Sequence, residues 1–273
     1  MARKIHKQLC IAALSLSLAP LANAAQTSSP LQPTKGENRW QAIGRIDIAK
    51  SGYCTGTLIA RNLVLTAAHC VYNERTGKLY AAKDLIFNAG LHNGKVNKSV
   101  RGKRIAVDKT YQPRGGTSKS NIRHDVALIQ LVTPVTNPKV IPYELHSGKS
   151  AGSNISVLSY GKGRDNALSQ QRICNILARD NGIMAFNCNV TFGSSGAPVF
   201  SKEGNQNRIL SLISSGGRMD GKTVSFGMEL PKIVEYLKRD LGEAPARRLG
   251  ISGVRILTVG QGKSTSGAKF IKN

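Results

Sequence analysis

Short apolar runs separated by turn residues restrict the fold of this chain more than any other feature. Two such runs, Gly52–Ile59 and Leu63–Thr66, are divided by three turn residues, and a second set lies within Ser153–Met228. The 28 glycines and the scarcity of long amphipathic periods favour strands. One helix is predicted at Pro231–Leu241, where proline occupies the first turn and Gly242 follows the last residue. We therefore expect an all-β protein with a C-terminal helix.

The two ends of the chain differ in composition from its middle. Residues 1–25 combine a basic start, an apolar stretch and an Ala22-Asn23-Ala24 cleavage motif, which is typical of a secretory signal peptide; a membrane anchor is the alternative. Residues 26–39 are polar and are expected to form a flexible leader or a propeptide. Residues 242–273 form a basic tail. These patterns predict export through a cleavable signal peptide, to the periplasm or out of the cell.

The chain is strongly basic, with 39 Lys and Arg against 15 Asp and Glu and a formal net charge of +24. Such a surface attracts anionic partners, for example acidic lipid, polysaccharide or nucleic acid, although a solvated face is the plainer interpretation. Aromatic residues make up only 5% of the chain, which argues against a base-stacking surface for single strands. Zinc-ligand spacings and phosphate-binding loops are absent from the sequence, so we expect no metal and no other cofactor.

Four cysteines remain once Cys10 leaves with the signal peptide, namely Cys54, Cys70, Cys174 and Cys188. In an oxidising compartment they predict two disulfides, for which three pairings exist. Pairing neighbours in sequence, Cys54 with Cys70 and Cys174 with Cys188, would close two short loops, each stabilising the fold by about 3 kcal/mol. Free buried thiols are the alternative.

The stretch Thr191-Phe192-Gly193-Ser194-Ser195-Gly196-Ala197-Pro198-Val199-Phe200 places hydroxyl groups between two glycines, just before an apolar run that predicts a strand. Glycine permits backbone conformations in which amide N–H groups point at a ligand. A serine nucleophile beside an oxyanion hole would use this arrangement. A plain hairpin turn has the same composition, so the stretch needs a base and an acid elsewhere before it indicates chemistry.

His69 is the most distinctive candidate for that base, because it follows an apolar strand directly and precedes Cys70. His92 and His146 lie in polar contexts and are expected at the surface. His124 precedes Asp125, but neighbouring residues of a strand point to opposite faces, so the two are not expected to act together. A structural role for His69 is the alternative.

Three stretches together resemble the signatures of the chymotrypsin/trypsin-like serine proteases, in that family's order. They are Thr66-Ala67-Ala68-His69-Cys70, Asp125-Val126-Ala127-Leu128 and Gly193-Ser194-Ser195-Gly196-Ala197-Pro198. The run from Cys54 to Ile59 is similar to the bacterial branch, of the glutamyl-endopeptidase or V8 type. The resemblance covers 40–241 and implies two orthogonal six-stranded antiparallel β-barrels with a closing helix. Barrel one would span about 40–135, barrel two about 150–230 and the helix 231–241.

The resemblance also implies a role for each matching residue. Ser195 would be the nucleophile, His69 the general base and Asp125 the carboxylate that orients it, with the backbone N–H groups of Gly193 and Ser195 as the oxyanion hole. Ser214-Ser215-Gly216 resembles the segment that pairs with a substrate strand, although a register shifted by one residue fits almost as well. The implied activity is that of a serine endopeptidase acting on proteins or peptides, and we expect a monomer.

The chain departs from the family at three positions that bear on activation and specificity. Ser194 stands where the digestive members carry the Asp that binds a freed N-terminal amine, so we expect activity without that switch. Asn189, expected to bind substrate together with Ser214 and Gly216, stands where tryptic members carry Asp. Ile213 stands where glutamyl-specific members carry His. We therefore expect a primary pocket for neutral, medium-sized side chains.

Two other functions compete with this interpretation. An α/β-hydrolase would require Gly at position 197, which is Ala197, and the triad order Ser, Asp, His, so that fold is excluded. A cationic protein that binds polyanions on a protease scaffold, with weak or lost catalysis, remains the alternative because of the charge.

Overall fold

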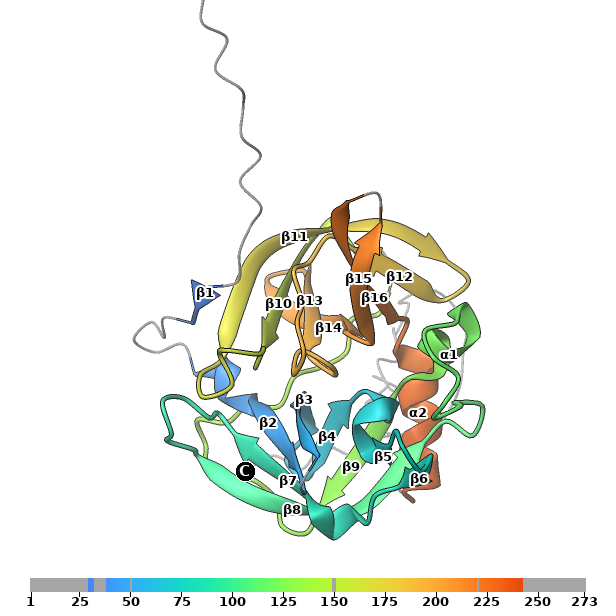
Figure 1. The fold of residues 1–273 in the computed structure, drawn as a ribbon. Coiled ribbons are helices and arrows are strands. Elements are labelled where there is room, and N and C mark those ends of the chain that lie inside the picture. Colours follow the sequence, from blue (N-terminus) through green and yellow to red (C-terminus); the bar gives the residue numbers. More distant parts are fainter. Residues whose placement is uncertain (1–28, 32–37, 50, 149–150, 220, 243–273) are drawn as a thin grey trace, which may run out of the picture.

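The computed structural model of the protein describes residues 29–31, 38–49, 51–148, 151–219 and 221–242. The expected signal peptide at 1–25, most of the leader at 26–39 and the tail beyond residue 242 lie outside these ranges. Within the described residues, no helix is both long and apolar enough to cross a membrane. Two β-structures lie one above the other, and the C-terminal helix packs against the lower one (Figure 1).

The first half of the chain forms a closed barrel in the order β2-β3-β4-β9-β8-β7 (Figure 1). Its strands are β2 (Ile43–Ile48), β3 (Gly52–Ala60), β4 (Leu63–Thr66), β7 (Leu85–Ala89), β8 (Lys98–Val107) and β9 (Ala127–Leu131). Gly44 and Gly56 lie opposite each other on β2 and β3. A Cβ at Gly44 would lie 2.4 Å from the Phe87 ring, and one at Gly56 would lie 2.6 Å from Ile46. The missing side chains at these positions allow large apolar side chains to fill the barrel.

The second half forms an antiparallel sheet in the order β14-β13-β10-β11-β12-β16-β15, with β1 added along β11. These strands are β10 (Asn154–Ser159), β11 (Ser169–Asp180), β12 (Ile183–Phe186), β13 (Pro198–Glu203), β14 (Gln206–Leu212), β15 (Ser215–Met219), β16 (Lys222–Met228) and β1 (Ser29–Pro30). A six-stranded barrel was expected here, whereas the described residues form an eight-stranded sheet. Ser211 of β14 bridges to β16, because its hydroxyl donates to the Met228 carbonyl at 2.8 Å and accepts from the Met228 N–H at 2.9 Å.

The remaining elements are short. They are the 3-10 turns η1 (Arg39–Ala42), η2 (Ala68–Val71) and η3 (Ala82–Asp84), the hairpin β5 (Tyr72–Asn73) and β6 (Lys78–Leu79), and the helices α1 (Lys119–His124) and α2 (Pro231–Asp240). Helix α2 confirms the helix expected at the C-terminus. Its Val234 and Leu237 are fully buried, and Arg104 of β8 donates to the Leu241 carbonyl at 2.8 Å. The helix thus returns the chain from the second sheet to the first barrel.

Residues 29–31, part of the segment expected to form a flexible leader or a propeptide, dock on the second sheet. Ser29 and Pro30 pair with β11, and the Leu31 N–H donates to the Leu168 carbonyl at 3.0 Å. The Leu31 side chain is 9% exposed and belongs to the main apolar core. Proline suits an edge strand because it has no N–H to donate, and the apolar Leu31 that follows the strand gains stability from burial.

Candidate active site

A cleft of about 1500 Å³ runs between the two halves and brings the predicted site residues together. The first barrel and its loops contribute Tyr53, His69 and Asp125 to its lining, and the second sheet contributes Gly193, Ser195 and residues 213–216. Side chains separated by more than 120 positions in the sequence therefore face one another here.

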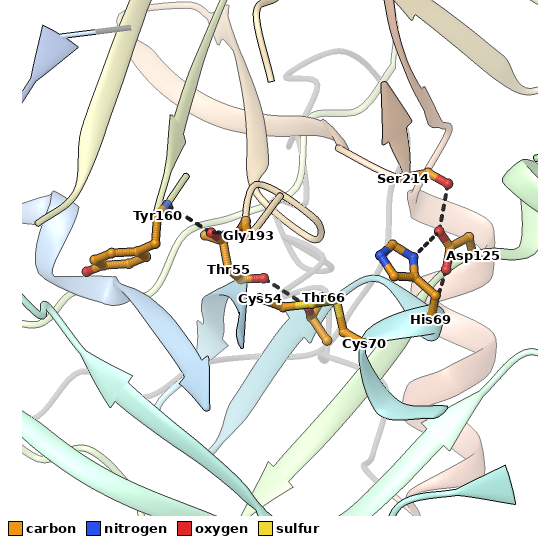
Figure 2. The surroundings of a disulfide bond; sticks show 9 residues. All are labelled: Cys54, Thr55, Thr66, His69, Cys70, Asp125, Tyr160, Gly193 and Ser214. Carbon is orange, nitrogen blue, oxygen red and sulfur yellow. Dashed lines mark hydrogen bonds and ion pairs between the residues drawn. A yellow bond between two sulfur atoms is a disulfide. The ribbon is translucent and has the colours of Figure 1, made fainter. Parts of the chain in front are cut away.

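His69 is fixed in place by η2 and by a disulfide. The 3-10 turn begins directly after the buried strand β4, and the Cys54–Cys70 disulfide ties it to β3, as Figure 2 shows. A second disulfide joins Cys174 to Cys188. Of the three pairings open to the four cysteines, the structure therefore contains the one that joins neighbours in sequence.

Asp125 holds His69 through both carboxylate oxygens (Figure 2). Its Oδ1 accepts from the His69 backbone N–H at 2.8 Å, and its Oδ2 lies 2.8 Å from His69 Nδ1. The Ser214 hydroxyl donates to the same Oδ2 at 2.6 Å. Asp125 lies between α1 and β9 and is 3% exposed, so all three donors come from the protein.

These contacts set the proton affinity of the imidazole. Burial lowers the pKa of His69, but the neighbouring Asp125 carboxylate and its hydrogen bond outweigh burial, with a smaller contribution from Glu74, so that the pKa is raised above its usual value. A proton on Nδ1 is thereby stabilised, which leaves Nε2 as the basic nitrogen.

The turn that carries Ser195 is held by Thr55 of the first barrel. The Thr55 hydroxyl donates to the Gly193 carbonyl at 2.8 Å, and the Thr55 N–H donates to the Ser195 carbonyl at 2.9 Å. Gly193 has a φ of +86°, and a Cβ there would lie 2.2 Å from the Tyr53 ring. Among the described residues, no acceptor pairs with the N–H of Gly193 or of Ser195. Both N–H groups are therefore available to an oxyanion.

Ser195 and His69 line the same cleft, but within the described part of the chain no hydrogen bond joins the serine hydroxyl to the imidazole. This link commonly forms or shortens only when substrate is bound. The histidine–aspartate pair is thus formed in the structure, whereas the serine–histidine contact is not.

The predicted substrate-binding residues divide into two groups. Ser214 contacts Asp125, and Ser215 and Gly216 of β15 line the cleft beside it. Asn189 is exposed, its N–H donates to Gln171 Oε1 at 2.7 Å, and it is not among the described residues that line the cleft. Val190 and Ile213 line the cleft instead, and a Cβ at Gly216 would lie 2.5 Å from Val190.

Two buried polar residues have surroundings that the sequence did not indicate. His146, expected at the surface, is 1% exposed, and its Nδ1 accepts from the Gly148 N–H at 2.9 Å. The loop that carries it folds over the second sheet, which buries an otherwise polar segment. Ser194 is also 1% exposed, and its hydroxyl donates to the Ser159 hydroxyl at 3.0 Å.

One group of residues in the described ranges has potential metal-ligand atoms close together, namely Cys54, His69 and Cys70, within 4.8 Å of one another. Both thiols are joined in a disulfide and His69 Nδ1 faces Asp125, so this group lacks the thiolates that a metal ion would require.

The cleft is also lined by residues that the sequence analysis missed. Tyr53, Tyr72 and Tyr111 form part of its first-barrel wall, and Phe192 stands at its rim with 84% of its surface exposed. No motif marks these residues. Only the direct sequence neighbourhood of Cys54 and Ser195 could have suggested Tyr53 and Phe192.

Curated proteases are similar to this chain in sequence. A snake venom serine protease, catroxase-1 of Crotalus atrox, is 29% identical over 156 residues, which cover 54% of this chain and 53% of that protein. The glutamyl endopeptidase of Bacillus licheniformis is 21% identical over 188 residues, which cover 67% of this chain and 57% of the relative. The chain thus spans about half the length of these curated relatives.

Solved structures show the same fold. One of a Glu endopeptidase in complex with MPD has a TM-score of 0.63 at 21% identity, covering 80% of this chain and 97% of that chain. A thermostable serine protease, AL20, from an extremophilic microorganism has a TM-score of 0.62 at 18% identity, covering 76% and 100%. The sequence model of the Trypsin family matches residues 31–228. With a match over most of its length, the chain belongs to the trypsin family.

Proposed function

We propose that the protein is an exported serine endopeptidase that cleaves peptide bonds through Ser195, His69 and Asp125. The observation that carries this proposal is the buried Asp125 carboxylate, which binds His69 twice and faces the cleft that Ser195 lines. The two disulfides agree with an oxidising compartment, either periplasmic or extracellular.

In the proposed reaction, Ser195 Oγ attacks the carbonyl carbon of the substrate while His69 Nε2 accepts the hydroxyl proton. Asp125 stabilises the imidazolium by accepting from its Nδ1–H. The N–H groups of Gly193 and Ser195 donate to the oxyanion of the tetrahedral intermediate. Collapse of the intermediate breaks the C–N bond, and the leaving amine takes the proton from Nε2. Water then cleaves the acyl-enzyme ester by the same steps, returning the proton to Ser195.

The structure supports a primary pocket for neutral side chains. Val190, Ile213 and the open position at Gly216 lie together on the second-sheet side of the cleft. None of these groups carries a charge that would offset the desolvation of Lys, Arg, Asp or Glu. Ser214–Gly216 would pair with the substrate residues that precede the cleaved bond.

We also propose that activity does not require a newly freed N-terminal amine. The Ser194 hydroxyl donates to the Ser159 hydroxyl in a buried position, so no carboxylate there needs a positive partner. Extending the mature N-terminus by two residues should leave kcat/KM unchanged. A loss of activity that returns when the extension is cut away would refute this independence.

A fluorophosphonate probe, which labels activated serines, tests the main proposal. The purified mature protein should be labelled, and Ser195→Ala should not, while cleavage of casein should be lost in the same variant. Absence of labelling together with salt-sensitive binding to heparin would instead favour the polyanion-binding alternative, which the exposed Lys98, Arg101 and Lys103 of β8 could serve.

A further inference from the structure

The charged residues that line the cleft are unevenly distributed. Three cations, Arg75, Arg114 and Lys162, are exposed there, whereas Glu74 is the one exposed carboxylate among the described lining residues. The other acid in the lining, Asp125, is buried and directed at His69. The solvent-facing part of the cleft therefore carries a net positive charge.

None of the three cations forms an ion pair with a carboxylate in the described part of the chain. The Arg114 guanidinium donates one hydrogen bond to the Thr76 carbonyl at 2.8 Å, which holds it beside the turn that follows Arg75. A guanidinium has five N–H donors, so most of those on Arg114 remain free for a ligand.

Lys162 is placed at the cleft rim by its backbone. Its N–H donates at 2.7 Å to the carbonyl of Phe192, the residue immediately before Gly193. The same N–H lies 3.0 Å from Thr191 Oγ1. The side chain therefore extends from a fixed backbone position next to the proposed oxyanion hole.

Two close approaches place Lys162 relative to a bound peptide. Gly216 lies against Val190, whereas Gly193 lies against Tyr53 and the carbonyl of Tyr160, two residues before Lys162. If Ser214–Gly216 pair with the residues before the cleaved bond, the residues after it must leave past Tyr53 and Lys162.

We propose that the cleft selects peptides that carry Asp or Glu near the scissile bond but outside the primary pocket, with Lys162 binding an acidic residue on the C-terminal side of that bond. This inference rests on the proposed endopeptidase function and adds a substrate class to it. The acidic side chains would bind at the exposed cations Arg75, Arg114 and Lys162, while the primary pocket still takes a neutral side chain. Glu74 weakens the attraction at its own end of the cleft, which makes Lys162 the strongest contributor.

Matched peptides test the proposal. A pool of peptides of mixed sequence is digested, and the best-cleaved sequence is identified. For each of the three residues on either side of the cleaved bond, one peptide with Asp and one with Asn at that position are then compared. At low ionic strength kcat/KM should be about twofold to fivefold higher for Asp than for Asn at the favoured positions, the range for exposed ion pairs. The ratio should approach one at about 1 M salt, where charges are screened within about 3 Å.

Charge-removing variants locate the effect. Lys162→Gln should abolish the Asp/Asn ratio on the C-terminal side, Lys162→Arg should retain it, and the double variant Arg75→Gln/Arg114→Gln should reduce the remaining preference. Lys202→Gln is the matched control, because Lys202 is exposed on β13 and is not among the described residues that line the cleft. That control should keep both the ratio and the activity of the wild-type protein.

Equal rates for Asp and Asn peptides at low salt would overturn the proposal, as would a ratio that Lys202→Gln lowers as much as Lys162→Gln does. Binding to Ser195→Ala is measured by fluorescence anisotropy, both with these pairs and with Asp and Asn forms of a fixed peptide whose sequence does not depend on cleavage, and the Kd ratio of each pair is determined. If no peptide is cleaved but the Asp form binds more tightly, the endopeptidase function fails while the preference of the cleft stands. If peptides are cleaved without any preference, only the inference fails.

Discussion

Replacing Asp125 by Asn tests the proposed mechanism most directly. The amide side chain has the shape of the carboxylate, but its NH₂ group donates hydrogen bonds where one carboxylate oxygen accepts them. In the structure, Oδ1 accepts from the His69 N–H, and Oδ2 accepts from both His69 Nδ1 and the Ser214 hydroxyl. Donors therefore surround both oxygens, and an NH₂ group must face at least one of them.

Asn can satisfy this site in only one reasonable way. Its oxygen would replace Oδ1 and accept from the backbone N–H of His69, since that donor cannot change. Its NH₂ group would then donate to His69 Nδ1, which places the imidazole proton on Nε2. In that tautomer Nε2 cannot accept the proton of Ser195, so the base is lost although the geometry is kept.

We expect kcat to fall by about 10⁴-fold. This loss corresponds to about 5 kcal/mol of transition-state stabilisation. The assay is the turnover of the best-cleaved peptide, together with the rate of fluorophosphonate labelling, which reports the nucleophile alone. Circular dichroism and the unfolding midpoint check that the fold is retained. Ser214→Ala is the comparison variant, because it removes one hydrogen bond to the same oxygen and should cost only about tenfold.

Turnover of Asp125→Asn within about tenfold of wild type would refute the mechanism, since a loss that small, about 1.4 kcal/mol, cannot reflect a wrong tautomer. If Asp125→Asn does not fold, Ser214→Ala tests the mechanism in its place. Its partial loss of activity should appear in kcat rather than in KM. An unchanged kcat in Ser214→Ala would then count against Asp125 as the orienting residue.

Four further predictions follow from the same structure. Because Asp125 raises the pKa of His69 and the base must be neutral, kcat/KM should rise with pH with a midpoint above about 6.5, the usual imidazole value; a lower midpoint contradicts this. Cys54→Ala/Cys70→Ala should lower the free energy of unfolding by about 3 kcal/mol in urea titrations, and equal stability would contradict it. Leu31→Ala should cost about 2 kcal/mol, whereas no change would mean that the segment does not dock. Ser194→Asp should bury an unpaired carboxylate and cost about 3 kcal/mol at pH 7, less at low pH; a cost independent of pH would contradict it.

The parts of the site that the sequence predicted are those fixed by short-range pattern. The strand before His69, the acid before β9 and the glycine-bounded turn around Ser195 each depend on a few adjacent residues. Their order along the chain then indicated the fold. The all-β expectation, the C-terminal helix and the likeness to the glutamyl-endopeptidase type were confirmed on this basis.

The parts that could not be predicted depend on contacts between distant segments. Asn189 matched a specificity position by counting back from Ser195, but its N–H donates to Gln171 of β11 and it is not among the described residues that line the cleft. His146 was expected in water because its neighbours are polar, yet the loop closes over the second sheet. Leu31 was assigned to a flexible leader, because a three-residue docking segment carries too few residues for a periodic pattern.

The segment from Lys95 to Arg123 contains nine Lys and Arg residues and a single acid, Asp108. It shows most clearly why composition alone could not separate structure from function. Arg104 donates to the last carbonyls of α2, where a cation stabilises the negative end of the helix dipole. Arg123 donates to the Asn181 carbonyl at 2.6 Å and joins α1 to the turn between β11 and β12. Arg114 alone among these three lines the cleft. At 0.1 M salt, charges in solution are screened beyond about 10 Å. Only cations that line the cleft, and not the net charge of the chain, can therefore distinguish one position of a bound peptide from the next.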